Sequence, residues 1–286
     1  MAKSKTIKNS DLAAMFRIVG ECRELGDDPL IWRQHFYGSL AGLIDADLAA
    51  GGELFDCIKA PIRTPGAALW GFEHGFDLSG LMLVWEWNQT DPYISLIWKE
   101  FHKRLESAPH SRVTTSHQQL LSPQNWDRSP DYQMVMRTLG ADAVIHSFHQ
   151  LPEGGDAFEG ICWFRAKGRP DFDEREVELV NLLHQEITRL IGGALARFDE
   201  PMPTQLPPRV RQVLACVLEG DSDKEVATRL KLSPHTVNHY NKQIFRHFGV
   251  TSRPELLSRW IRRGWTAKAA WNLPLCEPSF LIPYQD

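Results

Sequence analysis

Polar side chains recur at helical spacing between residues 234 and 248. At about 100° per residue they fall on one side of a helix, and no acidic residue interrupts that side. The set comprises His235, Asn238, His239, Lys242 and Arg246, with Gln243 beside it. Amide and imidazole groups can bond base edges in a DNA major groove, while lysine and arginine hold phosphates. The pattern favours a DNA-reading helix over an ordinary solvated face.

Two short helices joined by a tight turn are predicted to position this face. Residues 222–225 read Ser-Asp-Lys-Glu, a capping box that begins the first helix, which ends near Lys231. Ser233 and Pro234 then supply a cap and a first-turn proline for the second helix. The other side of the second helix is predicted to carry Val237, Asn241, Ile244 and Phe248, with Tyr240 at its edge.

The charge of the chain is unevenly distributed. The 286 residues include 32 basic and 36 acidic ones, for a net charge of −4. Residues 204–265 hold 11 basic and five acidic residues, a net +6, which leaves −10 for the remainder. A basic segment attached to an acidic body indicates a polyanionic partner for that segment alone.

Seven short motifs follow one another between residues 206 and 256. They are Leu206-Pro-Pro-Arg209, Val213-Leu214, Glu219-Gly220, Ser222-x-Lys224-Glu225-Val226-Ala227, Leu232-Ser233-x-x-Thr236-Val237, Ile244-x-Arg246-x-x-Gly249-Val250 and Arg253-x-Glu255-Leu256. Together they strongly resemble the LuxR/NarL-type helix-turn-helix. The resemblance implies a four-helix DNA-binding domain with Pro234 to Phe248 as the recognition helix. It also implies a dimer contact on the last helix, Pro254 to Arg263.

The resemblance and the helical spacing together define candidate site residues. Those expected to bind DNA are Lys224, His235, Thr236, Asn238, His239, Lys242, Gln243 and Arg246. Those expected to serve dimerisation are Leu256, Leu257, Trp260 and Ile261. Three positions depart from the family pattern, which usually has an acid at Val210, a basic residue at Asn238 and often a histidine at Tyr240. The preferred DNA sequence is therefore not carried over from the family.

A proline-rich segment divides the chain. Residues 199–208 contain four prolines, which lack a backbone donor and disfavour helix in the residue before them. We expect a first domain over residues 10–198, a linker over 199–205 and the helix-turn-helix domain over 206–265. Residues 266–286 hold many apolar side chains and three prolines, which favours an extended arm packed on its own or a partner subunit.

The first domain is predicted to be an antiparallel sheet flanked by helices, which makes the chain an α+β protein. Helices are expected over Leu12–Leu25, Pro29–Ile44, Asp91–Leu105 and Asp173–Phe198. Strands are expected over Leu78–Trp87, Ala143–Gln150 and Phe158–Ala166. Residues 106–130 are polar and irregular in pattern, and we expect a loop there.

The start and the end of this first domain are similar to a GAF domain or the related PAS type. Residues 28–33, Asp-Pro-Leu-Ile-Trp-Arg, lead into residues 40–47 in the manner of a GAF opening. Residues 160–165 and 169–176 are similar to a GAF close. The resemblance implies small-molecule binding, dimerisation or both. A phosphoryl-receiver domain is disfavoured because Asp27 and Asp28 lie between helices rather than after a first strand.

Six of the tryptophans that precede the linker are notable: Trp70, Trp85, Trp87, Trp98, Trp126 and Trp163. They could form an aromatic box for a planar or cationic ligand. Trp85 and Trp87 would then share one face of the predicted strand, with Glu86 on the other. Ordinary packing in the core is the favoured alternative.

Catalytic and metal-binding patterns do not emerge from the sequence. His146 and His149 are three apart in a predicted strand, which places their rings on opposite faces. His235 and His239 are four apart on a helix, but no cysteine or carboxylate completes a zinc site with them. No phosphate loop or nucleophile motif is present. We therefore expect no catalytic residues, no metal and no cofactor.

Cysteine usage and hydropathy indicate a cytoplasmic protein. The five cysteines are odd in number, scattered and never in a CxxC, which fits a reducing compartment. No apolar stretch approaches the roughly 18 residues of a membrane span, and residues 7–11 lack the apolar core of a signal peptide.

The sequence therefore predicts a transcription regulator rather than an enzyme. Its expected partners are double-stranded DNA, a second copy in a homodimer and an unknown small-molecule ligand. The alternative is a protein–protein interaction module that uses a LuxR-like fold without specific DNA binding.

Overall fold

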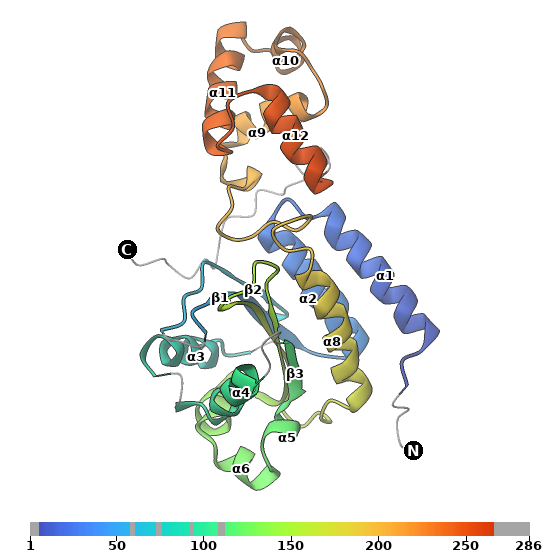
Figure 1. Ribbon diagram of the computed structural model, residues 1–286, viewed down its shortest axis with the longest axis vertical. Coiled ribbons are helices and arrows are strands. Elements are labelled where there is room, and N and C mark those ends of the chain that lie inside the picture. The colour runs from blue at the N-terminus through green and yellow to red at the C-terminus, as the bar shows by residue number, and fades with distance from the viewer. Residues whose placement is uncertain (1–5, 58–60, 73–75, 92–93, 108–111, 266–286) are drawn as a thin grey trace. The chain divides into compact units, whose positions relative to one another are not determined.

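The computed structural model describes residues 6–57, 61–72, 76–91, 94–107 and 112–265 (Figure 1). By their internal contacts these residues form two units. The first, here the sheet unit, holds the chain up to Val19 and Arg33–Ile191. The second, here the helical unit, holds Gly20–Trp32 and the chain from Gly192 onward. The expected tail, residues 266–286, lies outside the described residues.

A five-stranded antiparallel sheet forms the centre of the sheet unit. Its strands are β1 (Leu48–Phe55), β2 (Ala67–Trp70), β3 (Arg112–Ser116), β4 (Ala141–Gln150) and β5 (Ala157–Ala166). They lie in the order β2-β1-β5-β4-β3, so that β3 forms an edge. The predicted antiparallel sheet and the two long predicted strands are confirmed, whereas the sequence analysis missed β1, β2 and β3. The similarity to a GAF domain stays a prediction.

Three helices lie on one side of the sheet in Figure 1. They are α1 (Asn9–Glu24), α2 (Pro29–Ile44) and α8 (Glu174–Thr188). Trp163 of β5 packs against α2 and α8, with its ring centroid 6.0 Å from that of Phe36 on α2 and 6.4 Å from that of His184 on α8. The expected cap of α2 is present, because Asp28 Oδ1 accepts hydrogen bonds from the backbone N–H groups of Leu30 and Ile31.

Shorter helices cover the other side of the sheet (Figure 1). They are α3 (Ser79–Thr90), α4 (Leu96–Ser107), α5 (His117–Leu120), α6 (Pro123–Arg128), the π-helix Asp131–Met136 and α7 (Arg137–Leu139). The ring of Trp98 on α4 lies 5.2 Å from that of Phe148 on β4, which fixes α4 against this face.

Two predictions for this region were wrong. Residues 79–87 belong to α3 instead of a strand, with Leu78 at its N-cap, so Trp85 and Trp87 do not share a sheet face. Their apolar run fits either period, and Gly80 favours the helix: a Cβ there would lie 2.7 Å from the backbone oxygen of Val135, so only glycine permits this close packing. The expected loop at 106–130 instead contains β3, α5 and α6, whose short polar sequences carry little periodic signal.

The long helix predicted over residues 173–198 ends early. Asp173 caps α8, since its carboxylate accepts the backbone N–H of Glu176 at 2.9 Å. The helix stops at Thr188, and Gly192 beyond it has a φ of +79°. A left-handed glycine is incompatible with continued α-helix, so Leu190 and Ile191 pack outside the helix.

Four helices in the C-terminal part of the helical unit are arranged around one apolar core. They are α9 (Pro208–Leu218), α10 (Asp223–Leu230), α11 (Pro234–His247) and α12 (Arg253–Arg263), preceded by a 3₁₀ turn at Pro203–Gln205. The core includes Val213, Val226, Val237, Ile244 and Leu256, all fully buried. The predicted helical domain and its helix boundaries agree with the structure to within about two residues.

Among the described residues, no helix is both long enough and apolar enough to cross a membrane.

Candidate nucleic-acid interface

The start of α10, and the turn that joins it to α11, are set by capping and by one left-handed residue. Ser222 Oγ accepts the backbone N–H of Glu225, while the Glu225 carboxylate accepts the N–H of Ser222 at 2.7 Å. This is the predicted capping box, and it holds the pKa of Glu225 below its usual range. Lys231 ends α10 with a φ of +53°, and Ser233 then caps α11 by accepting the N–H of Thr236 at 3.0 Å.

One side of α11 is buried, as its spacing predicts. Val237 and Ile244 are fully buried, and Asn241 and Phe248 are nearly so. Val237, Ile244 and Phe248 pack against α9 and α10 in a shared apolar cluster. Burial of this side leaves the opposite side of α11 in solvent.

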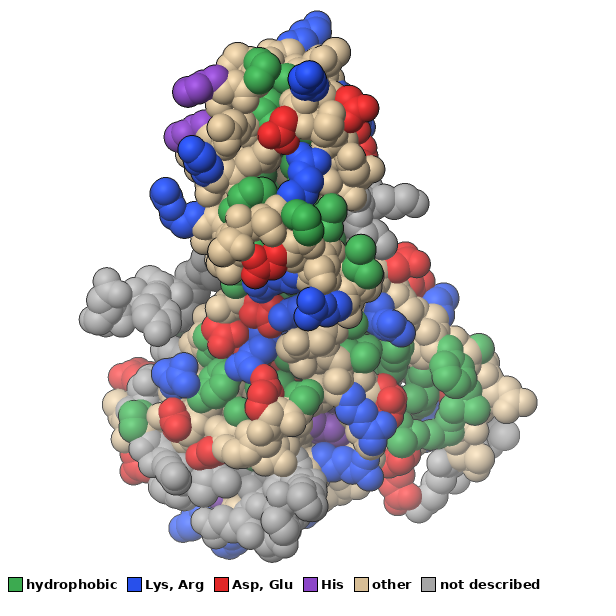
Figure 2. All heavy atoms as spheres, turned by 45° about the horizontal axis from the view of Figure 1, so that its top comes forward, with side chains coloured by type: hydrophobic (Ala, Val, Ile, Leu, Met, Phe, Trp, Pro, Cys, Tyr) green, Lys and Arg blue, Asp and Glu red, His purple; other side chains and the backbone are tan. Residues whose placement is uncertain are grey.

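The opposite side carries the sequence-predicted contacts. We call it the basic face; its exposed members are His235, Asn238, His239, Lys242 and Arg246. Gln243 is half-buried beside them and shares a hydrogen bond of 3.1 Å with His239. Thr236 is also half-buried, and Lys224 is exposed on α10. In Figure 2, histidine and basic side chains project side by side along one edge of the helical unit.

The positive charges of the unit differ in their availability. Arg229 on α10 is paired with Glu219 and, at 2.9 Å, with Asp221. Arg253 is paired with Asp223 at 2.8 Å. By contrast, the ion pairs found within the described part of the chain do not involve Lys224, Lys242 or Arg246. Lys242 and Arg246 of the basic face, and Lys224 on α10, therefore keep their charge available to an anionic partner.

The four predicted dimerisation residues do not share one environment. Leu256 and Trp260 are 0% and 3% exposed and belong to the core of the unit. Leu257 is half-buried, while Ile261 is 77% exposed. Ile261 is therefore the most exposed member of this set.

Sequence reasoning missed one exposed cation and one supporting acid in this unit. Lys231 occupies the turn between α10 and α11. Lysine is not a typical turn residue, so the sequence gave no signal for a turn at this position. Asp223 accepts hydrogen bonds from Asn241 on α11 and from Arg253 on α12. The capping box places Asp223 in the first turn of α10, but no local pattern reveals partners 18 and 30 residues away.

The remaining candidates of the sheet unit serve mainly in packing. Four of the six tryptophans (Trp87, Trp98, Trp126 and Trp163) are at most 8% exposed. Trp98 and Trp163 pack against opposite faces of the sheet, so they do not form one box. His146 and His149 also lie on opposite faces, as predicted: His146 contacts Cys162, and the His149 ring stacks on His184.

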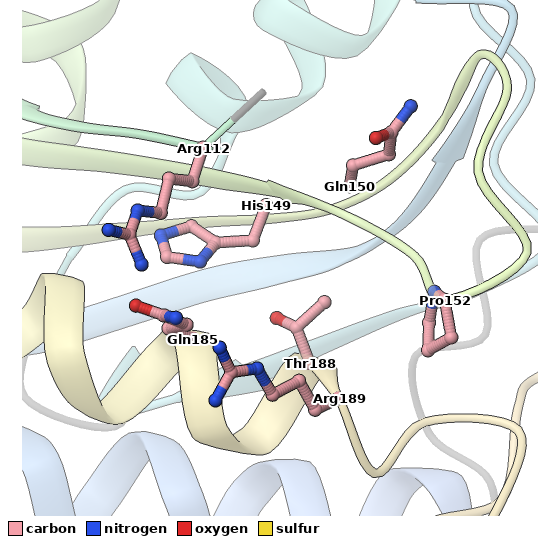
Figure 3. Close-up of a pocket in the computed structure, with 7 residues that line it drawn as sticks. All are labelled: Arg112, His149, Gln150, Pro152, Gln185, Thr188 and Arg189. Carbon is pink, nitrogen blue, oxygen red and sulfur yellow. The ribbon is translucent and has the colours of Figure 1, made fainter. Parts of the chain in front are cut away.

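A pocket of about 450 Å³ opens where β3 and β4 meet the last turn of α8 (Figure 3). Its lining residues are Arg112, His149, Gln150, Pro152, Gln185, Thr188 and Arg189. The pocket was not predicted from the sequence, because Arg112 lies within residues 106–130, where a loop was expected.

Comparison with known proteins identifies the helical unit. Residues 204–259 match the family described as "Bacterial regulatory proteins, luxR family". The chain thus carries a LuxR-family helix-turn-helix domain in its C-terminal part, which confirms that part of the predicted resemblance.

Two curated proteins and one solved structure place the match in context. GfsR of Streptomyces halstedii, a probable HTH-type transcriptional regulator, is 32% identical over 71 residues, which are 24% of this chain and 29% of GfsR. The response regulator Rre1 of Synechocystis sp. is 30% identical over 138 residues, or 46% of this chain and 59% of Rre1. The chain thus spans less than two thirds of these relatives. A structure of SdiA in complex with octanoyl-rac-glycerol aligns over 90% of this chain and 97% of SdiA, with 12% identity and a TM-score of 0.42.

Proposed function

We propose that this chain is a transcription regulator that binds double-stranded DNA through the basic face of α11. The observation that carries the proposal is the exposed, acid-free side of α11, on which Lys242 and Arg246 are not paired with any described acid. A helix about 10–12 Å across fits the major groove of B-DNA, where the amide of Asn238 and the imidazoles would meet base edges. Lys224, Lys242 and Arg246 would neutralise phosphates.

The regulator acts as a homodimer in this proposal. Two helix-turn-helix units related by a two-fold axis present their recognition helices to half-sites about one helical turn apart. Ile261 on α12 supplies an exposed apolar contact for the second copy. The sheet unit senses a small molecule, and the pocket beside β3 is the hollow that we assign to this role.

Salt dependence tests the proposal. Fluorescence anisotropy of the full chain with a labelled duplex should show affinity that falls steeply with salt, by about 0.9 log units per log unit for each phosphate contact. Lys242→Ala combined with Arg246→Ala should reduce that slope by the equivalent of about two phosphate contacts. Arg137→Ala removes one exposed arginine from the sheet unit and should leave the slope unchanged.

The interaction-module alternative gives a different result. A fold that holds protein partners instead of DNA would show weak duplex binding with the same slope in all three proteins. That outcome would overturn the DNA-binding proposal.

A further inference from the structure

The pocket of the sheet unit has an unusual chemical lining. Two arginines, two glutamines, a histidine and a threonine contribute to it, and none of the lining residues is acidic. Figure 3 shows the guanidinium of Arg112 beside the imidazole of His149, with Arg189 and Gln185 of the α8 end facing them. Polar groups from three separate elements therefore converge on one hollow.

The two guanidinium groups are available to a ligand. The ion pairs among the described residues leave out Arg112. Arg189 is paired with Glu186 at 2.7 Å, but these side chains are 61% and 51% exposed. Exposed pairs of this kind are weak, so the Arg189 guanidinium can exchange Glu186 for another anion. The full charge of Arg112 alone also outweighs the partial negative charge of about one half at the end of α8.

A chain of hydrogen bonds runs from the pocket into the core. His149 Nε2 lies 3.1 Å from Thr114 Oγ1, which lies 2.7 Å from Ser147 Oγ. Ser147 Oγ in turn lies 2.7 Å from His184 Nδ1. Burial lowers the pKa of His149 to about 3, with the charge of Arg112 adding to the effect, and burial also lowers that of His184. Both imidazoles are therefore neutral, with one proton each.

When both hydroxyls donate their single proton within the chain, the chain has two possible directions. If His149 donates, then Ser147 donates to His184, and the proton of His184 lies on Nε2. That nitrogen is buried and has no partner among the described residues. If His184 donates instead, its Nε2 is left with only a lone pair. Buried N–H groups without an acceptor are rare and costly, so the second direction is favoured.

The second direction fixes what His149 offers to the pocket. Its Nε2 accepts from Thr114, so its proton lies on Nδ1, the ring nitrogen left for a ligand. The pocket then combines this N–H donor with two guanidinium groups. We propose that the pocket is a binding site for an anionic small molecule, one that carries a carboxylate or a phosphate.

Arg112 and Arg189 hold the anion by charge-assisted hydrogen bonds, and His149 orients it through Nδ1–H. The volume of about 450 Å³ suits a metabolite rather than a bare ion. That this anion is the molecule sensed by the regulator rests on the proposed function. Binding of the anion to the pocket requires no DNA.

Calorimetric titration of the full chain with inorganic phosphate and, separately, with succinate tests the site at constant ionic strength. At least one probe should bind saturably at one site per chain. Arg112→Gln combined with Arg189→Gln should raise the dissociation constant at least tenfold, whereas Arg137→Gln should leave it unchanged. The preferred probe then distinguishes phosphate from carboxylate. Absence of saturable binding by both probes, or equal binding by the double variant, would overturn the proposal.

A measurement on the unmodified chain supports this test if the double variant fails to fold. Nitrogen-15 NMR of the histidine rings reports which nitrogen carries the proton. The proposal requires the Nδ1–H form of His149 and a shift of that signal on addition of the bound probe. An Nε2–H form of His149, or a His149 signal that does not shift when the probe is added, would contradict the proposal. If the unmodified chain binds the anion but does not bind DNA, only the proposed function is contradicted.

Discussion

The Nδ2 atom of Asn241 lies 3.0 Å from the Oδ1 atom of Asp223. The same Oδ1 atom accepts a hydrogen bond from Arg253 at 2.8 Å. One carboxylate at the start of α10 thus links the buried side of α11 to the first turn of α12. Because Asn241 is 6% exposed, this contact fixes how α11 presents its basic face.

Two asparagines of α11 should separate folding from DNA contact. Asn241→Ala removes a buried hydrogen bond and is expected to lower the free energy of unfolding by about 1–3 kcal/mol. Asn238→Ala removes an exposed side chain, so the change should stay within about 0.5 kcal/mol while DNA affinity falls. Urea denaturation and duplex binding of both variants provide the measurements. Equal stability of the two would contradict the role given to Asn241.

An exposed isoleucine on α12 should control the oligomeric state. Ile261→Glu places a charge at a side chain that is 77% exposed, and is expected to raise the dimer dissociation constant at least tenfold, or about 1.4 kcal/mol. Met82→Glu is the matched control, because Met82 is 50% exposed on α3. Sedimentation equilibrium measures both. A dimer that withstands Ile261→Glu would place the interface elsewhere.

Sequence periodicity predicted the helical unit well because its signals are local. Ser222 and Ser233 mark the starts of α10 and α11 through caps that span three residues. The spacing of Val237 and Ile244 predicts the buried side of α11. The α3 segment failed because its apolar run fits two periods, and the choice depends on Gly80 against the backbone of Val135.

The pocket and the core that supports it could not be predicted from local sequence signals. Arg112 and Arg189 come together only because β3 pairs with β4 and α8 packs across them. Their meeting depends on contacts between residues more than 70 positions apart, which no window of sequence contains.

A buried arginine should be essential to the sheet unit. Glu53 and Glu159 lie directly opposite each other on β1 and β5, and both are fully buried. Arg33 bonds to both, at 2.8 and 2.7 Å. Like charges at such a position repel, so Arg33→Met is expected to destabilise the fold by about 3–5 kcal/mol.

An exposed arginine provides the control for that variant. Arg63 lies 3.8 Å from Asp56, and both side chains are more than half exposed. Arg63→Met should therefore cost less than about 1 kcal/mol. Urea denaturation followed by tryptophan fluorescence compares the two. Similar losses would show that the Arg33 pairs are no more important than a surface contact.

Acid should destabilise the sheet unit through its buried histidines. The pKa of His184 is lowered by burial, then by His149 and Arg33, so the unfolded chain binds the extra proton first as pH falls. The free energy of unfolding is therefore highest above about pH 6.5 and decreases below it. His184→Asn removes one such proton and should reduce the pH slope below pH 6 by about 1.4 kcal/mol per pH unit. An unchanged slope in urea denaturation at several pH values would contradict this assignment.

Selection from a random duplex library with the full chain tests the central claim most directly. The account predicts an enriched palindrome with half-sites about one helical turn apart. It also predicts that His239→Ala combined with Lys242→Ala abolishes its recovery. A library that remains unenriched, or an enriched sequence that the double variant binds equally well, would contradict a DNA-reading role for α11.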